Sequence, residues 1–294
     1  MKLNQLRDLL AIVERGSLRA AARHLGQAQP ALTRSIRLLE QDLGTSLFER
    51  EARGMVLTPA GKLFYQRASL VVHELRHARE ELEQHTGKMT GTVVMGLSIM
   101  PHVGMLPQVL PQFREKFPQI KLKIIEGLYP AIEPGLREGS IDFYLGAAPE
   151  EAIESGLIST ELAQNTRTVV ARKDHPLTHA KSITDLKDAQ WASTSVSFNA
   201  ENDLIELFAQ HHLPPPQLMF QANSALSLMV ALTCTDLIAL LPVQWNDFHL
   251  TKDALQVIAI RETLPAPSIV CIQRPGLPLT PAAQWMFEAL RRAI

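Results

Sequence analysis

The 294-residue sequence has little cysteine, no long apolar run and almost no net charge, and each absence argues against a class of protein. Its two cysteines, Cys234 and Cys271, lack metal-type spacing, so neither a disulfide framework nor a CxxC zinc site is expected, and both are predicted to be buried. No segment reaches the roughly 18 uncharged apolar residues that a membrane span needs. The opening residues MKLNQLRDLLAIVERGS do not read as a signal peptide. We therefore expect a cytoplasmic protein with no membrane partner.

The composition is that of an ordinary globular protein, with 46% hydrophobic and 20% charged residues. A net charge of −1 conceals an asymmetry, because residues 1–58 carry nine Lys and Arg against six Asp and Glu. The stretch 15–39 holds five arginines and no acidic residue. A solvated helical face usually mixes both signs, so a one-signed run suits a polyanion such as nucleic acid, although a plain basic face remains an alternative.

Apolar residues at helical spacing predict three helices within the first 44 residues. The first begins behind Asn4 as its N-cap, and the second lies between Ser17 and Gly26. The third begins near Pro30, where a missing N–H costs nothing, and ends at Gly44. Its expected buried stripe is Ala31, Leu32, Ile36, Leu39 and Leu43.

Two helices joined by a short turn form a helix-turn-helix, whose second helix enters the major groove of DNA. Glutamine can pair with adenine and arginine with guanine. Two β-prone runs, 47–50 and 55–57, predict a hairpin wing whose arginines reach backbone phosphates. The residues expected to contact DNA are Ser17, Arg19, Gln29, Pro30, Thr33, Arg34, Arg37, Arg50 and Arg53.

At these residues the sequence resembles a known family. The segments GSL at 16–18, AAA at 20–22, QPALTRSI at 29–36, LF at 47–48 and LTPAG at 57–61 are similar to the winged helix-turn-helix of LysR-type transcriptional regulators. Ala28 departs from the family, which often has Ser there as a helix cap. The resemblance implies double-stranded promoter DNA and RNA polymerase as partners, a homotetramer built as a dimer of dimers, no enzymatic activity and no cofactor.

A long helix is predicted from Pro59 to about Thr86. Apolar residues at spacings of four and three form a heptad seam on it, which only another helix can cover. A second copy of the chain is the expected cover, and the chain's own C-terminal domain is the alternative. The seam residues are Phe64, Ala68, Val71, Leu75, Ala78 and Leu82.

The same helix contains His73, Glu74 and His77 in an HExxH pattern, which in zinc hydrolases holds the metal and activates water. No third ligand follows at family spacing. The heptad assignment places both histidines on outer positions, so we expect a solvated helix surface and no metal. A zinc hydrolase is kept as a remote alternative.

The last two hundred residues alternate strand-like and helix-like segments, which indicates α/β layering. Strands are predicted at 92–97, 121–126, 141–145, 167–170, 217–221, 237–241, 255–260 and 268–273. Helices are predicted at 107–117, 132–138, 200–212, 226–233 and 281–293. Two crossing strands are expected near 160–166 and 262–268. With LREGSIDF at 136–143 and DHPL at 174–177, this part resembles the periplasmic-binding-protein-like effector domain of the same family.

The expected fold is therefore mixed α/β. A winged helix-turn-helix at 1–58 precedes a linker and dimerisation helix at 59–88 and a two-lobed effector-binding domain at 89–294. Lobe I is expected at about 89–161 and 267–294, and lobe II at about 162–266.

In such folds ligands lie outside the carboxyl ends of strands, where hydroxyls and backbone N–H groups converge. The loops that follow the first strand of each lobe, at 98–102 and 193–199, are expected to face each other across the cleft. Their hydroxyls suit an organic acid, and Met100 and Phe198 suit an aromatic metabolite. No arginine lies in either loop, and capped solvated turns are the alternative. For His102, two interpretations remain: a hydrogen bond to the ligand, or a position on the protein surface. The expected effector-binding residues are Ser98, Ile99, Met100, His102, Leu128, Ala148, Thr194, Ser195, Ser197, Phe198 and Asn199.

The sequence thus predicts a DNA-binding transcriptional regulator that responds to a small-molecule effector. A small-molecule binding protein without a role on DNA is the main alternative.

Overall fold

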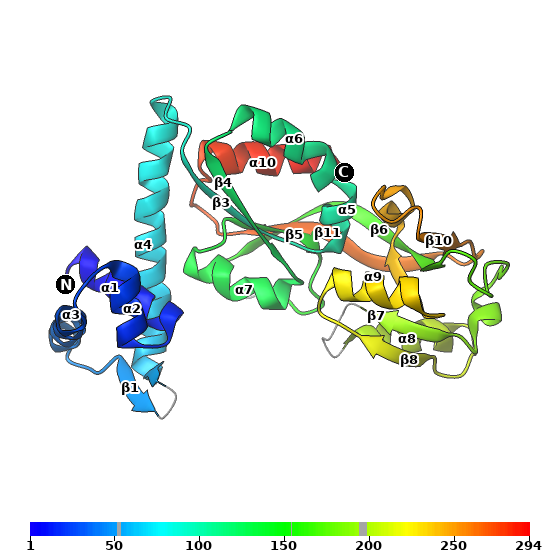
Figure 1. Cartoon of the computed structure of the whole chain (residues 1–294), viewed down its shortest axis with the longest axis horizontal. Helices are drawn as coiled ribbons and strands as arrows, with labels where there is room; N and C mark the ends of the chain where they lie inside the picture. Colours follow the sequence, from blue (N-terminus) through cyan, green and yellow to red (C-terminus); the bar gives the residue numbers. More distant parts are fainter. Residues whose placement is uncertain (52–53, 154, 194–198) are drawn as a thin grey trace.

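The computed structural model describes residues 1–51, 54–153, 155–193 and 199–294. A helical head and a larger α/β part lie on either side of one long helix (Figure 1). The head has the predicted three helices and hairpin. These are α1 (Leu3–Arg15), α2 (Leu18–Leu25), α3 (Gln29–Leu43) and the antiparallel strands β1 (Phe48–Glu51) and β2 (Gly54–Leu57).

The ends of the head helices follow from local hydrogen bonds. The Ser17 hydroxyl accepts the N–H of Ala20 at 3.2 Å and so caps α2, as predicted. Gly26 ends α2 at φ 64°, a left-handed conformation that gives the sharp turn before α3. The prediction that Asn4 caps α1 was wrong, because α1 begins at Leu3 and the Lys2 N–H donates to the Gln5 side chain at 2.6 Å.

The head has its own hydrophobic core. Leu9, Ile12, Leu32 and Leu39 are fully buried in it, together with residues of the hairpin. Two members of the expected α3 stripe, Ala31 and Leu43, are instead exposed, because only one narrow face of α3 meets α1 and α2. The remaining faces of α3 are therefore open to a partner.

The helix α4 (Pro59–His85) is 27 residues long and begins and ends close to where the sequence predicts. The Thr58 hydroxyl accepts the N–H of Gly61 at 3.0 Å, and Pro59 occupies the first turn. In Figure 1 this helix stands between the head and the α/β part.

The α/β part is built on one nine-stranded sheet of order β4-β3-β5-β11-β6-β9-β7-β8, with β10 paired to β6. Its first half, called lobe I here, has β3 parallel to both β4 and β5, and its second half, lobe II, has β7 parallel to both β8 and β9. The antiparallel strands β6 and β11 pass from one half to the other, as the predicted crossing strands require. The strands are β3 (Gly91–Leu97), β4 (Ile120–Glu126), β5 (Phe143–Ala147), β6 (Ile158–Arg172), β7 (Gln190–Ser193), β8 (Gln217–Gln221), β9 (Ile238–Pro242), β10 (Leu255–Ile258) and β11 (Leu264–Gln273).

Helices cover this sheet close to the predicted positions. The sequence does not predict the short helix α5, because it contains a proline. It does not predict the strand β7 either, because its four residues include no β-branched side chain. The helices are α5 (Ile99–Gly104), α6 (Leu106–Lys116), α7 (Tyr129–Glu138), α8 (Asn199–Gln210), α9 (Ala225–Cys234) and α10 (Pro281–Arg292), with short 3-10 turns at Ile183–Leu186 and Val243–Asp247.

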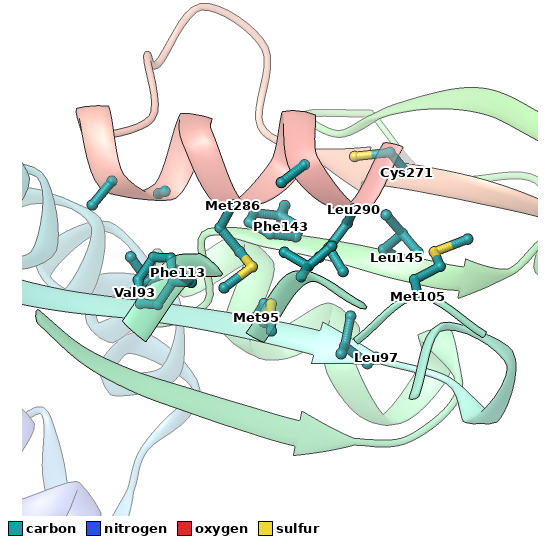
Figure 2. Close-up of a cluster of buried hydrophobic side chains, with 14 of the residues drawn as sticks. Val93, Met95, Leu97, Met105, Phe113, Phe143, Leu145, Cys271, Met286 and Leu290 are labelled. Atoms are coloured by element: carbon teal, nitrogen blue, oxygen red, sulfur yellow. The ribbon is translucent and has the colours of Figure 1, made fainter. Parts of the chain in front are cut away.

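The core of lobe I lies between α10 and the sheet. Figure 2 shows Met286 and Leu290 of α10 directed toward Met95 and Leu97 of β3. Cys271 is buried in this core, as expected, and burial raises the pKa of its thiol to about 12. The same expectation was wrong for Cys234, which is exposed at the end of α9.

No helix among the described residues is both long enough and apolar enough to cross a membrane.

Candidate DNA interface and ligand cavity

The outer face of α3 presents uncompensated positive charge. Gln29, Arg34 and Arg37 are exposed there, and Arg19 is exposed on the neighbouring α2. No carboxylate of the described residues lies within ion-pair distance of these three arginines. Their guanidinium groups are therefore available to an anionic partner.

Two acidic side chains of the head, Asp8 and Glu40, are used in internal hydrogen bonds. The buried Asp8 accepts a hydrogen bond from the Ser35 hydroxyl at 2.5 Å and so ties α1 to α3. Glu40 accepts the N–H groups of Leu47 and Phe48 at 2.8 and 3.3 Å, which holds the start of the hairpin. These contacts turn negative charge away from the arginine-bearing face and fix the orientation of α3.

The other predicted DNA-contacting residues have more varied surroundings. Ser17 is half-buried as a helix cap, and Pro30 is exposed in the first turn of α3. Thr33 is half-buried, and its hydroxyl donates to the backbone carbonyl four residues earlier at 3.0 Å. The backbone of Arg50 belongs to β1, but its side chain lies outside the described part, as does all of Arg53.

One face of α4 carries the predicted heptad seam. Its first residues, Phe64 and Ala68, pack on the core of the head. Further along, Val71, Leu75 and Leu82 are 54%, 48% and 63% exposed. Large aliphatic side chains at regular spacing are thus left in solvent over more than three helical turns.

Another face of α4 is docked on lobe I. The Ser69 hydroxyl donates to the Glu138 carbonyl oxygen at 2.9 Å, near the start of the contact. Near its end, the Gln84 side chain donates to the Thr90 carbonyl at 3.1 Å and accepts the Ala282 N–H at 3.0 Å. The linker helix is therefore attached to α7 and α10 by directional hydrogen bonds along its length.

The histidines of the HExxH pattern lie in this docked interface, so the prediction of a solvated surface was wrong. His77 is only 5% exposed, and its Nε2 lies 3.0 Å from Oδ1 of Asp142. The other oxygen of Asp142 accepts the Val94 N–H at 2.7 Å, which anchors the carboxylate in β3. Burial and the electrostatic effects of the neighbouring Arg76, His77 and Arg274 lower the pKa of His73 to about 4. Within the described residues, no group of three or more His, Cys, Asp or Glu side chains could hold a metal ion.

A cavity of about 520 Å³ lies between the two lobes. It is bounded by the start of α5, the start of α7, the loop after β5, the crossing strands, and β7 with α8. Five of the predicted effector-binding residues line it, namely Ser98, Ile99, Met100, Leu128 and Ala148. Its volume falls within the usual range for small-molecule sites.

The Ser98 hydroxyl, which the sequence predicts as an effector contact, lines the cavity and also makes a hydrogen bond within the protein. Ser98 is buried, and its Oγ accepts the Ala147 N–H at 3.2 Å, while Tyr144 donates to the Ala147 carbonyl at 3.1 Å. His102 does not line the cavity, and its Nδ1 lies 2.9 Å from the Ser98 carbonyl oxygen. The predicted residues Thr194, Ser195, Ser197 and Phe198 lie outside the described residues, and of Asn199 only the backbone at the start of α8 is described.

The cavity also contains charged and polar residues that the sequence analysis missed. Arg167 of β6 forms a 2.9 Å ion pair with Asp203 of α8. Glu133 of α7 also lines the wall, as do Asn165 and Trp191. The strand-end loops indeed lack arginine, but the crossing strand supplies one, one residue beyond the segment predicted to cross.

Comparison with known proteins covers both parts of the chain. Residues 3–62 match the bacterial regulatory helix-turn-helix proteins of the lysR family, and residues 86–294 match the LysR substrate binding domain. The transcriptional regulator GalR of Pseudomonas putida is 27% identical over 293 residues, covering 99% of this chain and 73% of its own length. The regulator GbpR of Azospirillum brasilense is 24% identical over 296 residues, covering 100% and 86%.

Solved structures agree with this fold. A variant of full-length OxyR from Pseudomonas aeruginosa has a TM-score of 0.72 at 20% identity and covers 100% of this chain and 94% of its own. Full-length CbnR in complex with its target DNA has a TM-score of 0.71 at 21% identity, with 100% of each chain covered. The chain therefore belongs to the LysR family of bacterial transcriptional regulators, with an N-terminal DNA-binding helix-turn-helix and a C-terminal substrate-binding domain.

Proposed function

We propose that this regulator reads promoter DNA with α3, holds phosphates with its hairpin, and responds to a small molecule bound between the lobes. The observation that carries the proposal is the exposed set Arg19, Arg34 and Arg37, which forms no ion pair with the described carboxylates, while Asp8 and Glu40 are held in hydrogen bonds inside the head. Arginine at the N-terminal half of a groove-reading helix can contact guanine, and the remaining arginines can neutralise phosphates.

The exposed seam of α4 supports a dimer. A second copy of α4 would cover Val71, Leu75 and Leu82 and place two heads side by side on a two-fold operator. We further propose that two such dimers form a tetramer and that RNA polymerase is the partner at the promoter. In this assignment residues 1–58 bind DNA, 59–88 dimerise and 89–294 bind the effector, in the cytoplasm where the DNA is located.

The docked face of α4 supports coupling between the two ends of the molecule. A ligand that prefers one arrangement of the lobes shifts the population toward it by its differential affinity. Because α4 is bonded to lobe I through Ser69 and His77, a rearrangement of lobe I would move the helix that carries the head. The spacing of paired heads on DNA would change accordingly.

The test is binding of Arg34→Ala to operator and to random DNA of equal length. Loss of a bidentate arginine contact costs about 1–3 kcal/mol of discrimination, so operator affinity should fall by about 5- to 150-fold with a much smaller loss on random DNA. Arg53→Ala should weaken binding to both DNAs alike. It should also reduce the slope of log affinity against log salt concentration by about one.

Arg292→Ala removes an equally exposed arginine at the other end of the chain and is the matched control, with no expected change. Equal losses on operator and random DNA for Arg34→Ala would show that α3 does not read bases.

A further inference from the structure

The two lobes are joined by a hydrogen bond outside the crossing strands. Oε1 of Glu126, at the end of β4 in lobe I, accepts the backbone N–H of Ala225, the first residue of α9 in lobe II, at 3.3 Å. The helix α9 has no side-chain cap of its own and no acidic residue in its first turn. The first N–H groups of a helix need acceptors and favour negative charge. The carboxylate of Glu126 therefore serves α9 as a cap supplied by the other lobe.

The residues that follow Glu126 reach the cavity between the lobes. Leu128 directly precedes α7, and Tyr129, Pro130 and Glu133 lie in the first turns of that helix. All four line the cavity. The helix α7 has ten residues, so it extends about 15 Å from the cavity toward the linker helix. A change at the cavity wall therefore acts directly on the start of α7.

The other end of α7 is held by the linker helix α4. The Ser69 hydroxyl donates to the Glu138 carbonyl oxygen at 2.9 Å, and the Tyr65 hydroxyl is hydrogen-bonded to the Glu138 carboxyl group. Gly139, which ends α7, lies so close to α4 that a Cβ atom added to it would be 3.3 Å from Cβ of His73. A displacement of α7 would therefore change its contacts with α4.

We propose that residues 126–139 couple the contact between the lobes to the linker helix that carries the DNA-binding head. This inference rests on the proposed effector response and names the segment that transmits it. While the lobes are in contact, α9 holds Glu126, and α7 keeps its position against α4. When the lobes separate, the start of α7 loses this restraint and Glu138 shifts on α4. A ligand in the cavity acts on the same segment by favouring one of the two arrangements.

The experiment is amide hydrogen exchange of the full-length protein without DNA, since exchange reports local opening. Glu126→Ala removes the acceptor for α9. We expect exchange to rise about two- to tenfold at the start of α9, as for loss of one hydrogen bond, and to rise also in residues 65–77 of α4. Glu115→Ala, which removes an exposed acid on α6 of the same lobe, is the matched control and should change neither region. Unchanged exchange of Glu126→Ala in either region overturns the proposal.

A second set of variants assigns the route. Tyr65→Phe combined with Ser69→Ala removes both hydrogen bonds to Glu138 and leaves Glu126 in place. In that background, Glu126→Ala should still raise exchange at the start of α9, but it should add no further change in α4. If Glu126→Ala changes α4 as much as it does in the otherwise unmodified protein, the effect does not pass through Glu138, and the proposal is overturned.

DNA binding separates failure of this inference from failure of the proposed function. The exchange experiment contains no DNA, so it decides the coupling even if Arg34→Ala shows that α3 does not read bases. On operator DNA, Glu126→Ala should change the affinity by about twofold or more relative to the control Glu115→Ala. Equal operator affinities of these two variants would show that the coupling does not reach the head and would overturn the proposal.

Discussion

At Gly61 the first turn of α4 runs so close to the hairpin that no side chain fits between them. A Cβ atom added there would overlap the backbone carbonyl of Leu47 and contact the side chain of Leu57. The Leu47 carbonyl also accepts the Thr58 N–H at 3.0 Å, so it cannot easily move away. A glycine inside a helix normally costs stability relative to alanine, and here close packing between head and linker reverses that preference.

We predict that Gly61→Ala destabilises the protein by about 1–3 kcal/mol, the usual cost of overpacking. Urea unfolding of the full chain measures the change. Gly127→Ala is the matched control, because the nearest atoms to its added Cβ lie at 3.5 Å or more, which is ordinary contact. A stabilised Gly61→Ala protein would show that the hairpin does not press on α4 in solution.

The helix α4 meets different surroundings on different faces. Phe64 and Ala68 contact the head, and Ser69 and His77 contact lobe I. Val71, Leu75 and Leu82 are largely exposed to solvent in the single chain. The contact with lobe I and the exposed seam lie on different sides of the helix. A partner can therefore cover the seam without breaking the contact between α4 and lobe I. A second helix can therefore add to this arrangement without replacing any intramolecular contact.

We predict that Leu75→Glu, alone or with Val71→Glu, converts dimers to monomers or weakens dimerisation at least tenfold. Burying an unpaired carboxylate in a helix seam costs several kcal/mol of association free energy. Analytical ultracentrifugation over a concentration series provides the measurement. Leu250→Glu, the same change at a site that is 72% exposed, is the control. Unchanged dimerisation of Leu75→Glu would mean that the seam is not the interface.

Elements with strong local signals were predictable from the sequence. Caps and periodicity placed α2 and α4, and the segment 217–221 matches β8 at both ends. Local sequence patterns did not predict the features that depend on contacts between residues far apart in the chain. The dock of His77 on Asp142 joins residues 65 positions apart, and a heptad pattern describes only the other face of α4. Arg167 and Asp203 reach the cavity from separate elements, so no local motif marks them as neighbours.

At the scale of the whole molecule, the contact between α4 and lobe I joins the DNA-binding head to the ligand-binding part, and it contains titratable groups. Burial first, and then Arg76, His77 and Arg274, lower the pKa of His73 to about 4, while Asp142 acts in the opposite direction. Burial also raises the pKa values of the carboxyls of Glu80 and Glu138 in the same interface. The stability of the junction should therefore depend on pH.

For His73 the sign follows from proton linkage. Between pH 6.5, its ordinary pKa, and about pH 4, the unfolded chain binds a proton at His73 that the folded chain excludes. Acidification through this window therefore destabilises the folded state, and stability is fully present above pH 6.5. The raised carboxyl pKa values of Glu80 and Glu138 oppose this, because their folded forms bind protons more readily, so a variant is needed to isolate the histidine.

We predict that the loss of unfolding free energy between pH 7.5 and pH 5 is smaller in His73→Leu than in the unmodified protein by about 1–2 kcal/mol, since one pKa unit corresponds to about 1.4 kcal/mol. Urea unfolding at the two pH values gives the difference. His179→Leu, which removes an exposed histidine from lobe II, should leave the pH dependence unchanged. If His73→Leu and the unmodified protein lose stability equally on acidification, His73 is not shielded from protons, and α4 does not remain docked on lobe I in solution.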